Sequence, residues 1–332
     1  MIRSRTQTLT QNLFILEPQH RERVWGGRKL KPADPPVGEA WVAFGESRVR
    51  EGARAGRTLA ELASLEGARL LGRDAAARYG ARFPLLVKLL DCADWLSVQV
   101  HPNDEQARRL VGPGEFGKCE AWHVLEAEDG ATVYAGVRPG TSRRGLEEAI
   151  RGGRILEVAE RLEVRAGQTI FIPAGTLHAV GPGLLLYEVQ QPSDTTFRVY
   201  DWGRPASAGR SLHVEESVEV ADPRMTADVR PLPPLGRTSA AAALDCPHFG
   251  LEVLSVEGAP LACDTLGRTF HVITVCEGEA EVCCGDERAR LGRFETALVA
   301  GGAGAYELRA GRGAARALRA TAPLPAGGAD CD

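Results

Sequence analysis

Short predicted strands separated by glycine and proline constrain the fold of this 332-residue chain more than any other feature. Apolar and β-branched residues fill brief segments, and turn residues interrupt each one before a helix-length run develops. The clearest segments are residues 162–164, 169–172, 179–180 and 184–190, with turns at Gly167, Pro173, Gly175 and 181–183. Strands so closely spaced favour a β-sandwich or barrel over a parallel α/β sheet, which needs a helix between successive strands.

A helical pattern interrupts this succession of strands early in the chain. Thr58 and Glu61 form a capping-box pair, and leucines then recur at roughly helical spacing until Gly72. Residues 37–44 and 83–91, on either side, have the length and apolar content of strands. We therefore expect a helical segment, residues 58–82, within a β domain.

The length and composition of the chain allow two domains. With 332 residues, of which 44% are hydrophobic, the chain can bury more than one core. Proline and alanine dominate residues 222–245, and short predicted strands resume between 249 and 322. The expected division is a first domain, a linker, a smaller second β domain and a mobile tail: residues 1–230, 231–245, 246–322 and 323–332.

The charge balance and the cysteines argue against several classes of protein. A formal net charge of −4 gives no overall attraction to nucleic acid or to an anionic membrane. No apolar run approaches the roughly 20 residues of a membrane span, and the run at 13–16 is too short for a signal peptide. The eight cysteines form no C-x-x-C pair, which favours free thiols over a zinc–thiolate site. We expect a soluble cytoplasmic protein.

Residues 95–102 combine a strand pattern with potential metal ligands. Apolar and polar residues alternate through Trp-Leu-Ser-Val-Gln-Val-His-Pro, so Gln99 and His101 share one face. A carboxylate at Glu120 and an imidazole at His178 lie on neighbouring predicted strands. These donors suit a borderline-soft divalent cation such as zinc, although glutamine is a poor zinc ligand. The alternative explanation of Gln99 and His101 is a polar strand face turned to solvent.

Four motifs occur in an order that resembles a known family. They are Ser-Val-Gln-Val-His-Pro at 97–102, Gly-Lys-Cys-Glu at 117–120, Pro-Ala-Gly-Thr-Leu-His at 173–178, and Glu-Val-Gln-Gln-Pro-Ser-Asp-Thr-Thr-Phe-Arg at 188–198. Over residues 13–225 the chain resembles type I mannose-6-phosphate isomerases (phosphomannose isomerases) of the short bacterial class, in the cupin superfamily. The resemblance implies a mainly β fold of two cupin-type (jelly-roll) β-sandwich domains, the second degenerate, with the helical segment in the first.

The resemblance also implies a reaction and a cofactor. The reaction is the interconversion of mannose 6-phosphate and fructose 6-phosphate through an enediol, catalysed by a metal-dependent aldose–ketose isomerase. One Zn²⁺ per chain is implied in the first domain, at Gln99, His101, Glu120 and His178. The chain departs from larger members at Val180, where they carry an aromatic residue. The second domain has His271 but no ligand-bearing strand, so we expect it to bind no metal.

Six further residues are candidates for catalysis or substrate binding. The implied active-site arginine is Arg198, whose planar guanidinium suits an enediolate or a phosphate. Lys118 precedes Glu120 by two residues and so shares its strand face, where a lysine near a cation has a depressed pKa that suits a base or proton relay. The remaining candidates are Glu188 and Asp194 as proton carriers, and Ser97 and Arg204 as contacts to the phosphate.

Simpler explanations exist for several of these residues. The alternative explanation of Lys118 is a surface lysine beside a turn. For Glu188 and Asp194 a structural salt bridge to Arg198 is an equally good explanation. Lys88 is a weak candidate, because a single charge in a buried strand is often paired with an acid.

Two other functions remain open from the sequence. A non-catalytic sugar-phosphate-binding cupin would act as a sensor, but Lys118 and Arg198 beside a full ligand set disfavour it. An iron cupin oxygenase typically binds its metal through two histidines and one carboxylate and leaves the other coordination positions open. A ligand set that includes Gln99 fits this pattern less well. The expected partner is a small-molecule sugar phosphate, with no nucleic acid or membrane partner, and the expected assembly is a monomer or weak homodimer.

Overall fold

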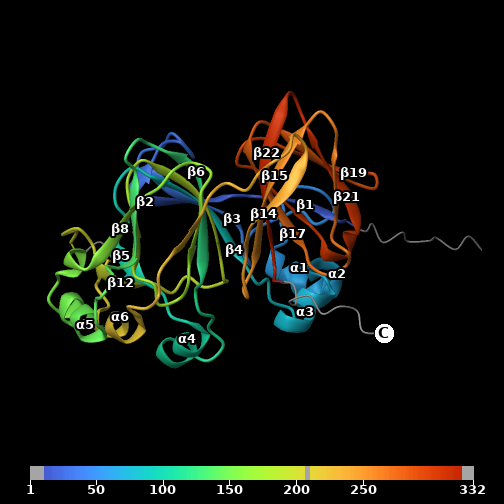
Figure 1. Ribbon diagram of the computed structural model, residues 1–332. Coiled ribbons are helices and arrows are strands. Elements are labelled where there is room, and N and C mark those ends of the chain that lie inside the picture. The colour runs from blue at the N-terminus through green and yellow to red at the C-terminus, as the bar shows by residue number, and fades with distance from the viewer. Residues whose placement is uncertain (1–10, 206–209, 324–332) are drawn as a thin grey trace, which may run out of the picture.

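The computed structural model describes residues 11–205 and 210–323, which form two β-sandwiches side by side (Figure 1). In the first sandwich a seven-stranded sheet packs against a five-stranded one. The larger sheet has the order β13 (Asp228–Arg230), β9 (Thr169–Ile172), β6 (Glu120–Ala127), β11 (Leu184–Gln190), β4 (Leu86–Cys92), β2 (Gln19–Gly27) and β3 (Val37–Ala43). The smaller has the order β12 (Phe197–Tyr200), β5 (Val98–Val100), β10 (His178–Val180), β7 (Thr132–Val137) and β8 (Ala159–Glu163).

The second sandwich packs a six-stranded sheet against a four-stranded sheet. The six-stranded order is β1 (Leu13–Leu16), β20 (Thr296–Val299), β17 (His271–Glu277), β22 (Ala314–Thr321), β15 (Gly250–Glu257) and β14 (Ser239–Asp245). The four-stranded order is β16 (Leu261–Asp264), β21 (Ala305–Ala310), β18 (Ala280–Cys284) and β19 (Glu287–Leu291). Strand β1 pairs with β20, so the start of the described chain belongs to the C-terminal sandwich.

Short helices cover the ends of the two sandwiches. They are α1 (Leu59–Glu66), α2 (Ala68–Leu71), α3 (Arg73–Tyr79), α4 (Asp104–Leu110), α5 (Arg143–Arg151) and α6 (Val214–Val220), with 3₁₀ turns at Ile155–Glu157 and Gly301–Ala303. Helices α1 to α3, drawn in blue, lie beneath the second sandwich (Figure 1). Gly72 has φ +85°, and a Cβ there would lie 2.3 Å from the carbonyl oxygen of Arg268, so only glycine allows this close approach.

One apolar cluster joins the two sandwiches and the α1–α3 segment. Phe14, Leu71 and Phe83 belong to the same buried cluster as Phe249 and Phe270. The rings of Phe83 and Phe270 lie 4.8 Å apart, and the Phe270 amide donates to the Leu71 carbonyl at 3.0 Å. The two sandwiches are therefore packed together by buried apolar surface.

The mainly β fold predicted from the sequence is confirmed, and the structure adds details that the pattern did not predict. The helical segment expected at 58–82 is broken into three helices, because Gly67 (φ +52°) and Gly72 interrupt it. The expected linker, 231–245, contains strand β14. This strand consists mostly of alanine and has none of the β-branched residues that are typical of strands. The expected strand at 95–102 is regular only over β5, Val98–Val100.

The described cysteines are all free, while Cys331 and residues 324–332 of the expected tail lie outside the described ranges. Within those ranges, none of the helices combines the length and the apolar character that crossing a bilayer requires.

Candidate metal centre and active site

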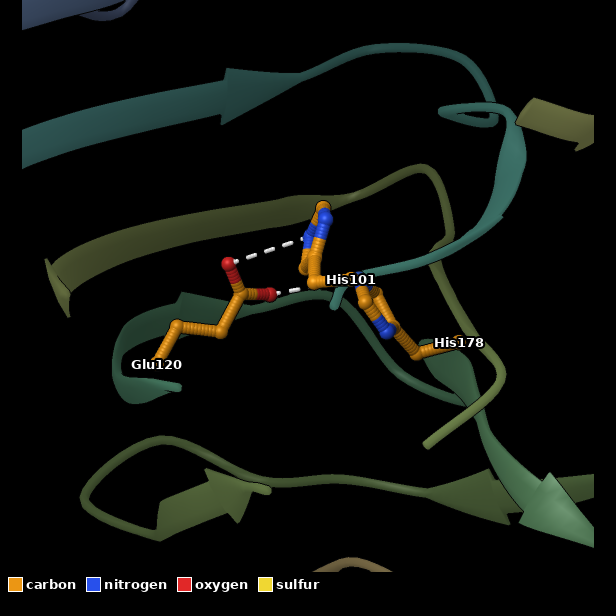
Figure 2. A group of neighbouring side chains, drawn as sticks. All are labelled: His101, Glu120 and His178. Carbon is orange, nitrogen blue, oxygen red and sulfur yellow. Dashed lines mark ion pairs between the residues drawn. The ribbon is translucent and has the colours of Figure 1, made fainter. Parts of the chain in front are cut away.

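His101, Glu120 and His178 converge in the interior of the first sandwich (Figure 2). His101 follows β5, Glu120 begins β6 and His178 begins β10, so three strands from both sheets position the cluster. The Nε2 atom of His101 lies 3.4 Å from Oε2 of Glu120, and that of His178 lies 3.2 Å from Oε1. All three side chains are at most 1% exposed. The expected strand alternation thus brings these residues together.

Backbone carbonyls fix the orientation of both imidazoles. Nδ1 of His101 lies 3.0 Å from the carbonyl oxygen of Thr195, and Nδ1 of His178 lies 2.9 Å from that of Thr176. A carbonyl only accepts, so each Nδ1 carries the proton and each neutral ring presents the Nε2 lone pair to the cluster. This is the arrangement that metal-binding histidines usually have.

The electrostatics of the cluster also fit a cation. Burial and the charge of Lys118 lower the pKa of His101 to about 3, which keeps the ring neutral. Burial opposes ionisation of Glu120, but the nearby charges, Lys118 foremost, outweigh it and hold the pKa of that carboxyl well below its usual value. Nε2 of His101 and Oε1 of Glu120 are buried without a hydrogen-bond partner in the described structure, while Oε2 of Glu120 has the Lys118 ammonium as its ion-pair partner. Two ring nitrogens and a carboxylate that face one another in this way form a set of divalent-metal ligands.

Gln99 lies at the edge of the cluster. It pairs across the strands with His178, and its Nε2 donates to Nε2 of His178 at 3.1 Å. Ser97 donates from Oγ to Oε1 of Gln99 at 3.4 Å. The amide therefore reaches the position expected for a fourth ligand, with its nitrogen rather than its oxygen toward the histidine.

A cavity of about 460 Å³ opens beside this cluster. It contains most of the residues singled out in the sequence: Ser97, Gln99, Lys118, Glu188, Asp194 and Arg198. Sequence reasoning singled out Lys88 only as a weak candidate and missed the other polar lining residues, which are Glu22, Arg23, Glu39, Thr196, Arg210 and His213. The lone acid Glu39 in the apolar run 37–44 was a usable signal, whereas nothing in the sequence marked Arg210 or His213.

Lys118 faces the cluster, so its interpretation as a surface lysine is wrong. Its side chain is 4% exposed, and Nζ lies 3.1 Å from Oε2 of Glu120. The ammonium therefore lies between a proposed metal ligand and the cavity.

Glu188 forms a buried ion pair with Lys88, and this corrects the alternative in which it would pair with Arg198. The residues oppose each other on β11 and β4, with Nζ 3.0 Å from Oε1 and both side chains 6% exposed. Burial lowers the pKa of Lys88, but the charges of Glu188, Glu39 and Asp194 outweigh it and raise that pKa. Burial raises the pKa of Glu188, so the carboxyl holds a proton more readily than an exposed glutamate.

Arg198 extends from β12 into the cavity. It lies across the strands from Gln99, and its Nη1 donates to the Ser211 carbonyl at 3.1 Å. Its backbone amide donates to Nδ1 of His213 at 3.1 Å. Its buried Nε has no partner within the described residues. Burial, with the charge of Arg210, lowers the pKa of this guanidinium.

Arg204 does not line the cavity, so its assignment as a phosphate contact is not supported by its position. Its Nη2 donates to Asp94 at 2.7 Å and to the Trp95 carbonyl at 2.8 Å, and its Nη1 donates to Asp201 at 3.1 Å. These partners occupy the guanidinium beside the cavity. Arg210, six residues later, lies in the cavity instead.

His271 in the second sandwich is a buried residue that is hydrogen-bonded to a neighbouring side chain. Its Nδ1 lies 2.7 Å from the Tyr306 hydroxyl, and burial lowers the pKa of the ring to about 3.

Comparisons with known proteins agree on one family. Residues 13–116 match the catalytic domain of type I phosphomannose isomerases. Mannose-6-phosphate isomerase ManA of Bacillus subtilis is 34% identical over 315 residues, spanning 90% of this chain and 96% of that protein. Mannose-6-phosphate isomerase of Streptococcus mutans is 33% identical over 296 residues, spanning 85% and 90%. The crystal structure of a Bacillus subtilis mannose 6-phosphate isomerase superposes with a TM-score of 0.77 at 26% identity, spanning 93% of this chain and 99% of that one.

Proposed function

Since this chain belongs to the type I phosphomannose isomerase family, we propose that it interconverts mannose 6-phosphate and fructose 6-phosphate. The observation that carries the proposal is the buried His101–Glu120–His178 cluster beside a cavity with ionised side chains. Buried charged groups are costly and concentrate at active sites, so this cavity favours a catalyst over a sugar-phosphate sensor.

The cluster fits one zinc ion per chain. His101, Glu120 and His178 would hold it, and Gln99 would join them after turning its amide so that the oxygen faces the ion. When bound, a zinc ion acts as a Lewis acid and stabilises negative charge on the sugar oxygens at C1 and C2. Two nitrogen and two oxygen ligands suit zinc. An iron oxygenase typically uses two histidines and one carboxylate and keeps the other metal positions open, so a fourth protein ligand at Gln99 would disfavour it.

The chain's own residues supply the proton transfer and the electrostatics. Isomerisation moves a proton between C1 and C2, so it needs a group that both accepts and returns a proton. Glu188 is suited to this role because its pKa is raised while Lys88 holds the carboxyl in place at 3.0 Å. Asp194 lines the same cavity and is the second candidate. Lys118 is placed to donate to a sugar oxygen beside Glu120.

The positive charge of Arg198 would stabilise the negative charge of the enediolate. Its guanidinium stays ionised at any working pH, so its contribution is electrostatic rather than basic. Ser97 lines the same part of the cavity and offers a hydroxyl to the phosphate.

The proposed setting is the cytoplasm, which fits the free thiols of the described cysteines. The proposed assembly is a monomer or weak homodimer, which size-exclusion chromatography with light scattering would test.

An enzyme-coupled assay tests the function directly. The zinc-loaded protein should form fructose 6-phosphate from mannose 6-phosphate and should leave unphosphorylated mannose essentially unconverted. A His178→Ala variant, checked for folding by circular dichroism, should be inactive. A zinc-loaded wild-type protein that interconverts neither sugar phosphate would overturn the proposal.

A further inference from the structure

We propose that Arg210 is a substrate-phosphate contact beside Arg198, and that Asp201 positions its guanidinium. The inference rests on the proposed function and deepens it. It assigns the phosphate end of the cavity and replaces Arg204, the residue expected from the sequence, by Arg210.

Asp201 is the centre of a small buried network. It is 4% exposed. Its Oδ2 accepts from Nε of Arg210 at 2.5 Å, and its Oδ1 accepts from Nη2 of Arg210 at 2.9 Å. This fork fixes the plane of the guanidinium. Within the described residues Nη1 of Arg210 has no hydrogen-bond partner, which leaves that edge for a ligand.

Arg204 holds the other side of Asp201. It donates to Oδ1 of Asp201 at 3.1 Å while its Nη2 bonds Asp94 and the backbone beside it. The neighbouring Trp202 donates from Nε1 to the Leu96 carbonyl at 2.7 Å. These contacts tie the segment that carries Asp201 to the chain just before β5. Arg204 therefore holds Asp201 in place, and Asp201 in turn fixes the position of the Arg210 guanidinium.

Arg210 and Arg198 form the cationic end of the cavity. Both residues line the cavity. The charge of Arg210 contributes to the lowered pKa of Arg198, so the two guanidinium groups are close enough to repel each other. The Ser211 carbonyl, next to Arg210, accepts from Arg198 and links the two residues.

Acidic residues line the cavity too, and two of them are paired with cations. Glu188 pairs with Lys88, and Glu39 pairs with Arg23 at 2.9 Å. The charge of Asp194 also acts on Lys88. Arg210 offers the open edge of a guanidinium fork, which matches phosphate oxygens in geometry and charge, and Arg198 beside it is left to face the enediolate. The sugar would then extend from the arginines toward Glu188.

Steady-state kinetics of Arg210 variants test the proposal. A phosphate contact made equally in ground state and transition state affects KM rather than kcat. Arg210→Ala should raise KM for mannose 6-phosphate roughly 10- to 100-fold, the loss expected for a charged hydrogen bond, with kcat within about threefold. The inhibition constant of inorganic phosphate should rise by a similar factor. Arg210→Lys should recover only part of the loss.

Asp201→Asn and Arg204→Ala separate positioning from contact. Asp201→Asn should weaken inorganic phosphate inhibition less than Arg210→Ala does, and should lose little further when combined with it. Arg204→Ala should lower the melting temperature and leave KM nearly unchanged. Arg224→Ala, with a side chain 84% exposed, is the matched control and should match wild type.

Three outcomes would overturn the proposal. They are an unchanged KM and phosphate inhibition in Arg210→Ala, a larger KM effect in a stably folded Arg204→Ala, and full recovery in Arg210→Lys. If wild type proved inactive, the proposed function would fail, whereas calorimetry of inorganic phosphate binding to wild type and Arg210→Ala would still decide the role of Arg210.

Discussion

Lys88 illustrates how much of the site depends on single residues. It lies inside a strand whose seven residues are all buried, and its ammonium is neutralised by Glu188 at 3.0 Å. Removing one partner of a buried ion pair leaves an uncompensated charge, whereas removing both with apolar residues is often tolerated.

This pair gives a prediction that separates stability from catalysis. Lys88→Met should lower the free energy of unfolding by about 3–5 kcal/mol, measured by urea denaturation. The double variant Lys88→Met/Glu188→Leu should recover most of that stability while remaining without activity. A single variant as stable as wild type would show that the pair is not an energetic unit.

Arg198 should act on the transition state. Arg198→Ala should lower kcat roughly 10²–10³-fold with little change in KM, as for the loss of one donor to a developing oxyanion. Arg198→Lys should restore little, because one ammonium cannot reproduce the planar fork. Zinc content is measured for each variant as the control. A near-normal kcat in Arg198→Ala would leave catalysis to Lys118 and the acids.

At this scale the sequence pattern brought the ligand cluster together, whereas the phosphate contact stays a prediction at Arg204 and a proposal at Arg210. Strand alternation places Gln99 and His101 on one face, and that inference needs only the period of a strand. The choice between Arg204 and Arg210 depends on the path of the chain after β12 and on which arginine meets Asp201 and Asp94. A sequence does not determine such a loop path from local pattern.

Helix α4 holds the segment that carries Lys118 and Glu120. Oδ1 of Asp104 accepts from the Gly117 amide at 2.7 Å and from Nε2 of Gln191 at 2.9 Å. A Cβ at Gly117 would lie 2.5 Å from backbone atoms of Asn103 and Asp104, so glycine is required for this contact. The first turn of the helix and the start of β6 are thus joined directly.

Asp104→Ala should therefore weaken the metal centre without touching it. Loss of both hydrogen bonds should release the Gly117 segment and lower zinc affinity roughly tenfold, because residues that orient ligands influence affinity in this way. Competition with a chelator of known affinity measures the change, and exposed Glu105→Ala is the control. Equal affinities in both variants would contradict this role for α4.

Elements with a distinct local signal were predictable, and elements without one were not. The Thr58 capping box begins a helix at the expected residue. Strands β19 and β22 lack a local signal because alanine, arginine and glutamate supply most of their residues. These strands form through pairing in the completed sheets rather than through intrinsic preference.

The whole molecule is more interwoven than its sequence order suggests. Strand β1 belongs to the C-terminal sheet, and α1 to α3 share a core with Phe249 and Phe270. The domain division at residues 230 and 246 stays a prediction. Long-range pairing of this kind leaves no local signal, which is why the helical segment was assigned only to the first domain.

Truncation tests that division. A fragment of residues 1–230 should unfold at a lower urea concentration than the full chain, because β1 loses β20 and the shared core is exposed. It should also bind a hydrophobic dye, while keeping all four proposed ligands. A fragment with the midpoint of the full chain would establish the first domain as autonomous.

The central claim is that isomerase activity depends on one zinc ion held by His101, Glu120 and His178. The most direct measurement is a titration of chelator-stripped protein with zinc, following bound metal and the rate of mannose 6-phosphate isomerisation in the same samples. We expect no activity at the start, a rate proportional to bound zinc, and saturation at about one ion per chain, with neither binding nor activity in Glu120→Ala. Full activity in the metal-free protein, or activity and tight zinc binding in Glu120→Ala, would contradict it.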